Sequence, residues 1–366
     1  MLIATAGRLF GDQGFTAVGM EQVAATINVR PAALYRHMAS KNALLLAATE
    51  ASLAPLLEAV ADPDRLLDEI LPQMARATAA DRGGARLWIR EFRHLEAEGR
   101  QLIEEEIGSL VSRLSHDLVH ERGDPPPIAL RRARAVLMTF ASAAFHGLEP
   151  SQRRLESFLT RAARRLADVS LPALQPMKTT PPQPERTRRR DQLLAGAIEL
   201  FAARGYATVS VEEIASAAGI ASGTFYSHFS GKRQLLAAAI SEAESLLRDE
   251  IDRALPPDGD PALSLRRLLE QYIRMVTTRP DITTILVNDS VELDQAERLQ
   301  AGRVIDDLVN RWASLVRSVV GCSSTEARMR GHATLWVVHG LTLWPPIGEA
   351  ADEAFVLAAA SSVLFG

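Results

Sequence analysis

The chain has 366 residues, with 41 Lys and Arg against 45 Asp and Glu, and a formal net charge of −4. This balance excludes a protein that coats nucleic acid over its whole surface, so any contact with DNA must come from local basic patches. The length allows two or more domains, and 47% hydrophobic residues can fill large cores. The single cysteine, Cys322, excludes an internal disulfide and fits a reducing cytoplasm.

The sequence predicts neither a membrane span nor a signal peptide. No run is expected to supply the roughly 18 apolar residues of a spanning helix. Met1 leads directly into an amphipathic pattern instead of a charged and then apolar leader. We therefore expect a cytoplasmic protein without membrane contacts.

The first fifty residues predict three short helices. Residues 2–14 carry apolar side chains on one face, and a second helix opens near Gly19. Asn28 tolerates the left-handed conformation of a tight turn, and Pro31 suits the first position of a third helix. A short third helix after a tight turn is typical of a helix-turn-helix.

From Lys41 to about residue 168 the pattern is helical throughout. Breaks are expected at Pro63, at Gly83, at Gly99, at the prolines 125–127 and at Pro150. Six helices therefore follow the first three.

The second half of the chain repeats the first. Residues 219–232 match residues 28–41 without a gap, and Tyr, His and Lys stand at matching places. Gly219 replaces Asn28, and both types tolerate a left-handed turn. Residues 293–298 also match residues 95–100, so the whole unit is duplicated and not only its first three helices. A proline-rich segment, residues 171–185, separates the copies as a semi-stiff linker.

Both copies resemble the DNA-binding domain of the TetR family of bacterial transcription repressors. The resemblance covers about fifty residues in each copy. Its carriers in the two copies include these residues: Phe10, Gly14, Phe15, Tyr35, His37 and Lys41; Phe201, Gly205, Tyr206, Gly219, Tyr226, His228 and Lys232. Two copies in one chain are similar to the tandem TetR-type repressors of actinobacteria.

The resemblance implies an all-α fold of two tandem TetR-like units, each with a three-helix DNA-binding domain and a six-helix bundle. The expected domains are these: DNA-binding domains at 1–45 and 186–236, ligand-binding or dimerisation-like bundles at 46–170 and 237–366, and the linker at 171–185. TetR-like proteins pair through their last two helices. Residues 127–168 and 324–365 would then pair within one chain as a pseudo-dimer, and a further homodimer stays open.

The same resemblance assigns side chains to DNA. Tyr, His and Lys of each copy would hold phosphates, because hydroxyl, imidazole and ammonium groups all donate to phosphate oxygens. Base edges would be read from the third helix, and Arg36 in place of Ser227 predicts different preferences, because arginine reads guanine. The expected contacts are these: Arg30, Pro31, Tyr35, Arg36, His37, Lys41, Arg188, Arg189, Arg190, Ser222, Thr224, Tyr226, Ser227, His228 and Lys232. The alternative is a solvated polar helix face, and for the arginines a linker end.

Aromatic and histidine side chains recur at helical spacing in both bundles. Core packing explains such spacing, but bundle interiors also form apolar ligand pockets. The candidates for contact with an apolar effector are these: Trp88, Phe92, Phe145, His146, Trp312, Trp336, His339 and Trp344. His116 and His120 stand four residues apart like zinc ligands, but a third ligand is lacking. No metal or other cofactor is therefore expected.

These features predict a regulator of transcription that binds a double-stranded DNA operator and leaves it when an apolar small molecule binds. A second interpretation is a DNA-bound regulator whose pocket has closed and which answers to a partner protein. A third is a helical enzyme with accessory DNA-binding modules. The sequence lacks a Ser–His or Cys–His pairing and a Gly-rich phosphate loop that would support the enzyme.

Overall fold

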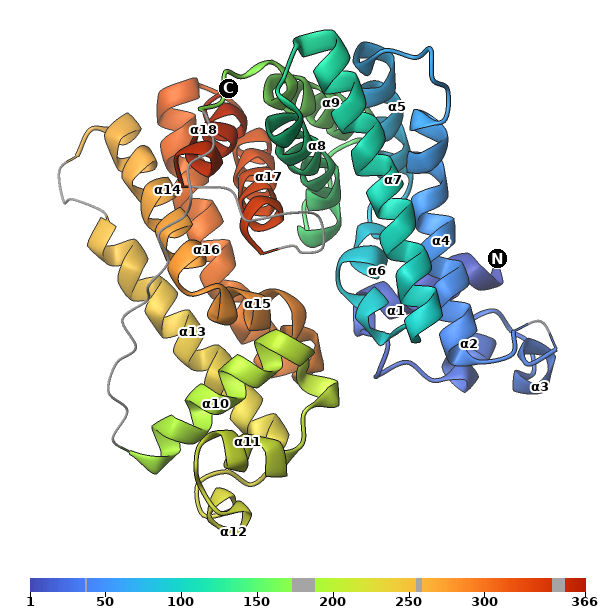
Figure 1. Cartoon of the computed structure of the whole chain (residues 1–366), viewed down its shortest axis with the longest axis vertical. Coiled ribbons are helices and arrows are strands. Elements are labelled where there is room, and N and C mark those ends of the chain that lie inside the picture. Colours follow the sequence, from blue (N-terminus) through green and yellow to red (C-terminus); the bar gives the residue numbers. More distant parts are fainter. Residues whose placement is uncertain (37, 173–187, 255–258, 344–352) are drawn as a thin grey trace. The chain divides into compact units, whose positions relative to one another are not determined.

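The computed structural model describes residues 1–36, 38–172, 188–254, 259–343 and 353–366, and these are helical with no strand (Figure 1). They form two compact units. The first unit contains Met1–Met177 together with Trp312–Gly366, and the second contains Lys178–Arg311. The expected second bundle, residues 237–366, therefore contributes helices to both units.

The first copy has the expected three plus six helices. Its DNA-binding part contains α1 (Leu2–Gln13), α2 (Met20–Thr26) and α3 (Pro31–Leu34). Its bundle contains α4 (Lys41–Val60), α5 (Leu67–Ala80), α6 (Ala85–Ile89), α7 (Ala97–Arg122), α8 (Pro126–Ala141) and α9 (Gln152–Asp168), with the short 3₁₀ helices η1 (Glu91–His94) and η2 (Ser142–Phe145). Proline stands at the start of α3 and α8, where its missing N–H has no intrahelical partner to lose.

The second copy repeats this order among its described residues. Its DNA-binding part contains α10 (Arg189–Arg204), η3 (Tyr206–Thr208), α11 (Val211–Ala217) and α12 (Ser222–Phe225). Its remaining helices are α13 (Lys232–Ala254), α14 (Pro261–Thr278), α15 (Pro280–Asn288), η4 (Ser290–Glu292), α16 (Gln295–Val320), α17 (Ser324–Thr342) and α18 (Glu353–Leu364). The tandem all-α fold is therefore confirmed.

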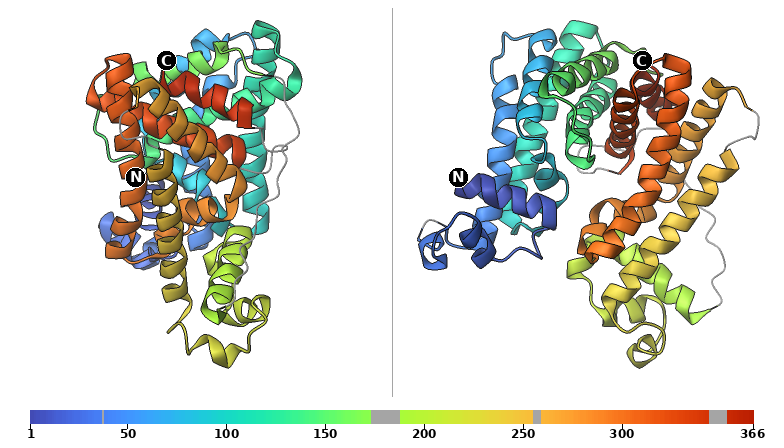
Figure 2. Two further views of the ribbon diagram at one scale, coloured as in Figure 1. Left: turned by 90° about the vertical axis from the view of Figure 1, so that its left-hand side faces the viewer. Right: turned by 180° about the vertical axis from the view of Figure 1, so that it is seen from behind.

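Four helices, two from each copy, pack together inside the first unit. Helix α17 packs on α8 and η2, and α18 packs on α9, as the views in Figures 1 and 2 show. Gly340 allows the close approach of α17 to α8, because a Cβ atom there would collide with the side chain of Met138. These are the segments that the sequence analysis expected to pair.

A buried arginine joins the two helices of each copy, α8 with α9 and α17 with α18. Arg132 of α8 donates to the carbonyl of Val169 after α9 at 2.8 Å, and its Nε lies 2.6 Å from a carboxylate oxygen of Asp124. Arg330 of α17 donates to the carbonyl of Leu364 at the end of α18 at 3.4 Å. In both copies the guanidinium binds carbonyls that the last turn of a helix leaves without intrahelical partners.

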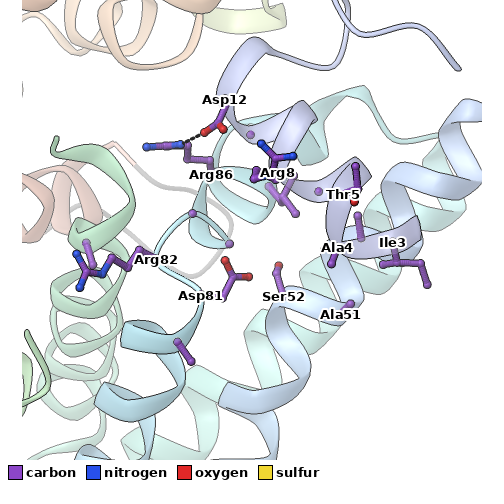
Figure 3. A pocket seen from close by; sticks show the side chains of 18 of the residues that line it. Ile3, Ala4, Thr5, Arg8, Asp12, Ala51, Ser52, Asp81, Arg82 and Arg86 are labelled. Atoms are coloured by element: carbon purple, nitrogen blue, oxygen red, sulfur yellow. Dashed lines mark hydrogen bonds and ion pairs between the residues drawn. The ribbon is translucent and has the colours of Figure 1, made fainter. Parts of the chain in front are cut away.

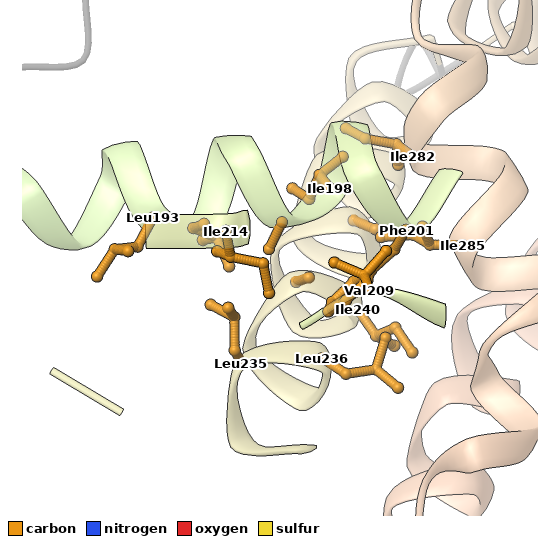
Figure 4. Packing of buried hydrophobic residues seen from close by; sticks show 14 of the residues in the cluster. Leu193, Ile198, Phe201, Val209, Ile214, Leu235, Leu236, Ile240, Ile282 and Ile285 are labelled. Atoms are coloured by element: carbon orange, nitrogen blue, oxygen red, sulfur yellow. The ribbon is translucent and has the colours of Figure 1, made fainter. Parts of the chain in front are cut away.

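The second unit has a core that joins its DNA-binding helices to its bundle. Figure 4 shows apolar side chains from α10, α11, α13 and α15 converging, with Phe201, Ile214, Leu236 and Ile285 among the labelled residues. These four side chains are at most 1% exposed. The short helices of the DNA-binding domain are therefore held by tertiary packing, since helices of their length are unstable alone.

One helix meets the length and composition of a membrane span, contrary to the sequence expectation. Helix α4 has 20 residues and a mean hydropathy of 1.5 over its most apolar window, 44% of which is buried inside the structure. Leu44, Leu45 and Leu53 on this helix are fully buried. The apolar content of α4 is thus used in the core of the first unit.

Candidate nucleic-acid interface

The turn between the second and third helices has the backbone geometry that the sequence predicts. Asn28 has φ 57° and Gly219 has φ 66°, and Asn28 is the one non-glycine residue with positive φ among the described residues. The chain then returns to the preceding helix: the N–H of Val29 donates to Ala24 at 3.0 Å, and that of Ile220 to Ala215 at 2.9 Å. Other side chains would strain this conformation.

The third helices bury one face and expose the other. Leu34, Phe225 and Phe229 are at most 3% exposed, as expected for inward anchors. Tyr35 and Tyr226 are 52% and 61% exposed, although tyrosine is an amphipathic residue that usually covers apolar surface. The two tyrosines therefore project from corresponding positions of the two copies.

The other expected base and phosphate contacts lie on the same exposed faces. Arg30, Pro31, Arg36 and His228 are exposed, and Thr224 is half-buried. Ser227 is exposed as well, and its hydroxyl donates to the carbonyl of Thr224 at 2.7 Å, so its oxygen keeps its lone pairs free for a base donor. His37 and the side chain of Ser222 lie outside the described residues.

The two lysines have different partners from the expected phosphates. The ammonium of Lys232 donates to the carbonyls of Tyr206 and Val209 at 2.7 and 2.8 Å, and it lies 4.2 Å from the ring centroid of Tyr206. Lys41 likewise lies 4.1 Å from the ring centroid of Phe15. Burial lowers the pKa of both ammonium groups. Lys232 therefore binds the loop between the first two helices of its domain, and Lys41 lies against a ring in the corresponding loop of the first copy.

The three arginines expected to contact DNA in the second copy, Arg188, Arg189 and Arg190, lie at the start of α10. Helix α10 begins at Arg189, with Arg188 as its N-cap, so Arg189 and Arg190 belong to its first turn and do not precede it. Arginine is a good helix former, and the guanidinium carbon of Arg190 lies 5.1 Å from the ring centroid of Phe229. Arg188 and Arg189 are exposed and form no recorded ion pair among the described residues, so they keep their donors for an anion.

A buried carboxylate ties each DNA-binding domain to the bundle of its own copy. The N–H of Phe15, after α1, donates to Oε2 of Glu91 at 2.8 Å, and the N–H of Tyr206, after α10, donates to Oδ1 of Asp289 at 3.2 Å. Both acids are 0% exposed. Arg90 strengthens the first tether, with Nε 2.6 Å from Glu91 and Nη2 donating to Gly11 at 2.7 Å.

Neither acid of this pair stands out in the sequence by a motif, although their matching positions are a signal. The match of residues 95–100 with 293–298 has an offset of 198, and the same offset places Glu91 opposite Asp289. From the sequence alone, Glu91 beside Arg90 is interpreted as an ion pair at the surface, because burial is known only from the structure. Two acids at matching places in a duplicated unit were the available clue.

In a comparison with known proteins, one family model matches the start of both copies. The model "Bacterial regulatory proteins, tetR family" matches residues 2–48 and again residues 193–239. Each of the two copies therefore begins with a TetR-type DNA-binding domain. It is 34% identical over 91 residues to the HTH-type transcriptional activator FasR of Mycolicibacterium smegmatis, covering 25% of this chain and 42% of FasR. It is 44% identical over 73 residues to the HTH-type transcriptional repressor KstR2 of the same organism, covering 20% of this chain and 31% of KstR2.

The matches to FasR and KstR2 therefore span less than half the length of each relative. Among solved structures, a TetR-family regulator from Bordetella parapertussis aligns with 16% identity and a TM-score of 0.45, over 50% of this chain and 96% of its own. The family model describes bacterial regulatory proteins, and FasR and KstR2 are named as regulators of transcription.

The TetR-type bundles use most of the predicted effector contacts in packing. Trp336 of α17 lies against Phe145 of the first copy, with ring centroids 3.9 Å apart, and its other neighbour is His339 at 5.4 Å. Trp88 and Trp312 are fully buried, and Phe92 is half-buried. Trp344 lies outside the described residues. Trp336 and His339 are thus placed at the contact between the copies.

The histidines of this contact are kept neutral by burial. Burial lowers the pKa of His146 to about 4 and that of His339 to about 3. His116 and His120 on α7 have ring centroids 4.1 Å apart, but the described residues contain no group of three metal-type ligands. His116 is an exposed side chain beside the Arg113–Asp117 pair.

Proposed function

We propose that this TetR-family protein is a single-chain pseudo-dimer that represses transcription from a non-palindromic operator. The observation that carries the proposal is the packing of α8 and α9 with α17 and α18, one helix pair from each copy. Paired symmetric subunits demand a palindromic operator, whereas two unlike copies in one chain do not. The covalent link also raises the effective concentration of the second DNA-binding domain near the operator, once the first domain is bound. Each DNA-binding domain, residues 1–45 or 186–236, is called a reader below.

The two readers differ at the position that faces the base edges. Arg36 stands in the first copy where Ser227 stands in the second. A guanidinium binds the two acceptors of guanine, whereas a serine hydroxyl accepts or donates a single hydrogen bond. We therefore expect half-sites of different sequence, with centres about one helical turn or slightly more apart.

The test begins with selection of bound genomic fragments, followed by footprinting and the stoichiometry of the complex. The expected result is one chain on two unlike half-sites. The matched variants Arg36→Ser and Ser227→Arg should exchange the base preference at one position in each half-site. A perfect palindrome occupied by two whole chains would overturn the pseudo-dimer.

We further propose that a mostly apolar small molecule releases the protein from DNA in the cytoplasm. Relatives named as repressors, such as KstR2 and DhaR, support repression, although FasR is named an activator. An effector acts by binding the arrangement that cannot bind DNA more tightly, by about 1–3 kcal/mol for a typical coupling. The rival interpretations, a partner-driven regulator and an enzyme, have no feature in their favour among the described residues.

The second copy offers a specific place for such an effector. Oε1 of Glu244 on α13 and Oγ1 of Thr283 on α15 are buried and have no hydrogen-bond partner among the described residues. The corresponding positions of the first copy are Leu53 and Ala85. Burying polar groups without partners costs free energy, so a ligand with a hydrogen-bond donor would be stabilised there.

A thermal-shift screen of apolar metabolites, with and without a donor group, tests this assignment. Donor-bearing compounds should raise the midpoint of the wild type. They should raise the midpoint of a Glu244→Leu, Thr283→Ala variant less, because that variant carries the apolar side chains of the first copy at both positions. Equal shifts in both proteins would exclude this site, and an absence of any shift would favour a regulator that answers to a partner protein.

A further inference from the structure

A cavity lies in the first unit, apart from the buried aromatic contacts. It has a volume of about 880 Å³ and lies between α1, the middle of α4, the loop from α5 to α6, and η2 (Figure 3). Part of its wall is apolar, with contributions from Ile3, Ala48, Leu87 and Ala143. A small molecule with an apolar body would therefore bury that body against α1 and α4.

The polar part of the wall carries an excess of positive charge. Arg8 of α1, Arg82 of the loop and Arg86 of α6 line the cavity from three separate elements. Figure 3 shows that the side chain of Arg82 extends away from that of Arg8. The carboxylate of Asp12, also in the wall, pairs with Arg86 at 2.5 Å, and Asp81 is the other carboxylate. The wall thus contains two further arginines, Arg8 and Arg82, and one further carboxylate, Asp81.

These two arginines keep donors for a ligand. Arg82 uses Nη2 on the carbonyl of Pro150 at 2.7 Å, and no other bond of its guanidinium is recorded among the described residues. Arg8 is exposed and has no recorded ion pair with a described residue. Arginine presents a planar fork of donors that fits carboxylate and phosphate oxygens.

The end of the cavity at His146 is also basic. The charged groups that act on His146 are Arg82, Arg86 and Arg328, and its ring lies 5.3 Å from that of His332. No carboxylate is among the described groups that act on it. An anion placed at this end would therefore meet positive charge from both α17 and the loop before α6.

We propose that this cavity binds an amphipathic anion, with a carboxylate or phosphate head attracted by the excess of arginines in its wall and an apolar body along α1 and α4. This site is separate from the effector site suggested around Glu244, and it needs no assumption about the second copy. Because α1 belongs to the first DNA-binding domain and η2 to the contact with α17, an occupant joins the first reader to the pseudo-dimer contact.

Calorimetric titration of the full chain tests the proposal with four ten-carbon probes that differ in their heads. These are decanoate, decyl phosphate, 1-decanol and decyltrimethylammonium. At least one anionic probe should bind tenfold or more tightly than decanol, and the cation should bind most weakly. The stronger of the two anions identifies the head as carboxylate or phosphate. Equal affinities for decanol and both anions would overturn the proposal.

Variants locate the site. An Arg8→Gln, Arg82→Gln protein should lose the preference for the anion over decanol, while Arg154→Gln on the exposed face of α9 should keep it. Ala51→Phe, at an exposed position of the cavity wall, should weaken all probes by filling the space. If the double variant does not fold, Arg8→Gln alone and Ala51→Phe decide. Binding that keeps its preference for the anion in the arginine variant and its strength in Ala51→Phe would place the anion elsewhere and refute the site.

Discussion

The buried tether of the first copy allows a quantitative prediction. Glu91→Ala removes the acceptor for the N–H of Phe15 at 2.8 Å and for Nε of Arg90 at 2.6 Å. Hydrogen bonds to charged groups contribute about 1.5–3 kcal/mol each, and removing one partner of a buried ion pair costs about 3–5 kcal/mol. We therefore expect Glu91→Ala to lower the free energy of unfolding by about 3–5 kcal/mol. This is a large part of the about 5–15 kcal/mol by which native domains are stable.

The second copy supplies a weaker version of the same perturbation. Asp289→Ala removes the acceptor for the N–H of Tyr206, and this bond is longer at 3.2 Å than the 2.8 Å bond of the first copy. We expect a loss of about 1.5–3 kcal/mol. Glu91→Gln should lose less stability than Glu91→Ala, because its amide oxygen still accepts from Phe15 while the charge opposite Arg90 is lost.

Urea unfolding followed by circular dichroism, together with DNA binding measured at each half-site, checks both parts. Since Phe15 lies between α1 and α2, the Glu91 variants should weaken the first half-site selectively, and Asp289→Ala the second. Glu58→Ala, an exposed position on α4, is the matched control. The reasoning is refuted if Glu91→Ala unfolds like Glu58→Ala, or if both half-sites weaken equally.

Three further outcomes are expected. Changing Arg188 and Arg189 to Ala should lower the slope of log affinity against log salt by roughly 1–2 units, measured by fluorescence anisotropy, because each neutralised phosphate contributes about 0.9. Burial lowers the pKa of His146 to about 4, so the unfolded chain binds its proton first, and stability falls as pH drops from about 6.5 toward 4. At pH 5 this histidine alone should lower the free energy of unfolding by roughly 2 kcal/mol. His146→Gln should remove this contribution to the pH dependence of the urea midpoint. Glu244→Leu, which copies Leu53, should raise the unfolding free energy by about 1–3 kcal/mol in the same assay, and a loss would show that the carboxylate has a partner.

Features set by local backbone chemistry could be predicted from the sequence. The turn at Asn28 and Gly219 needs a positive φ, which few residue types adopt, so matching residue types in the two copies revealed it. Ser210 and Glu213 form a capping box at the start of α11, which the types and spacing of these two residues favour. The duplication strengthened each of these inferences, since two sequences had to satisfy one geometry.

Features that depend on tertiary approach could not be predicted. The positive charge of Lys232 suggested a phosphate contact, but its ammonium meets carbonyls more than twenty residues earlier in the chain. Trp336 and Phe145 were candidates for contact with an effector in separate bundles, and the fold brings their rings together across the two copies. Residue type indicates what a side chain can bind, and only the fold decides which partner reaches it first.

The residues that differ between the two copies indicate more about function than the residues that the copies share. Both copies keep the buried arginine that closes the last two helices, Arg132 and Arg330, and both keep a buried acid behind the reader. These shared parts hold the fold and the readers in place. The copies differ at the position that we propose to face the bases, with Arg36 against Ser227, and in the bundle, with Leu53 against Glu244. A duplicated protein that keeps these buried residues and varies its surface and pocket residues can recognise two half-site sequences and bind a ligand in one copy. Identical subunits related by two-fold symmetry cannot do so.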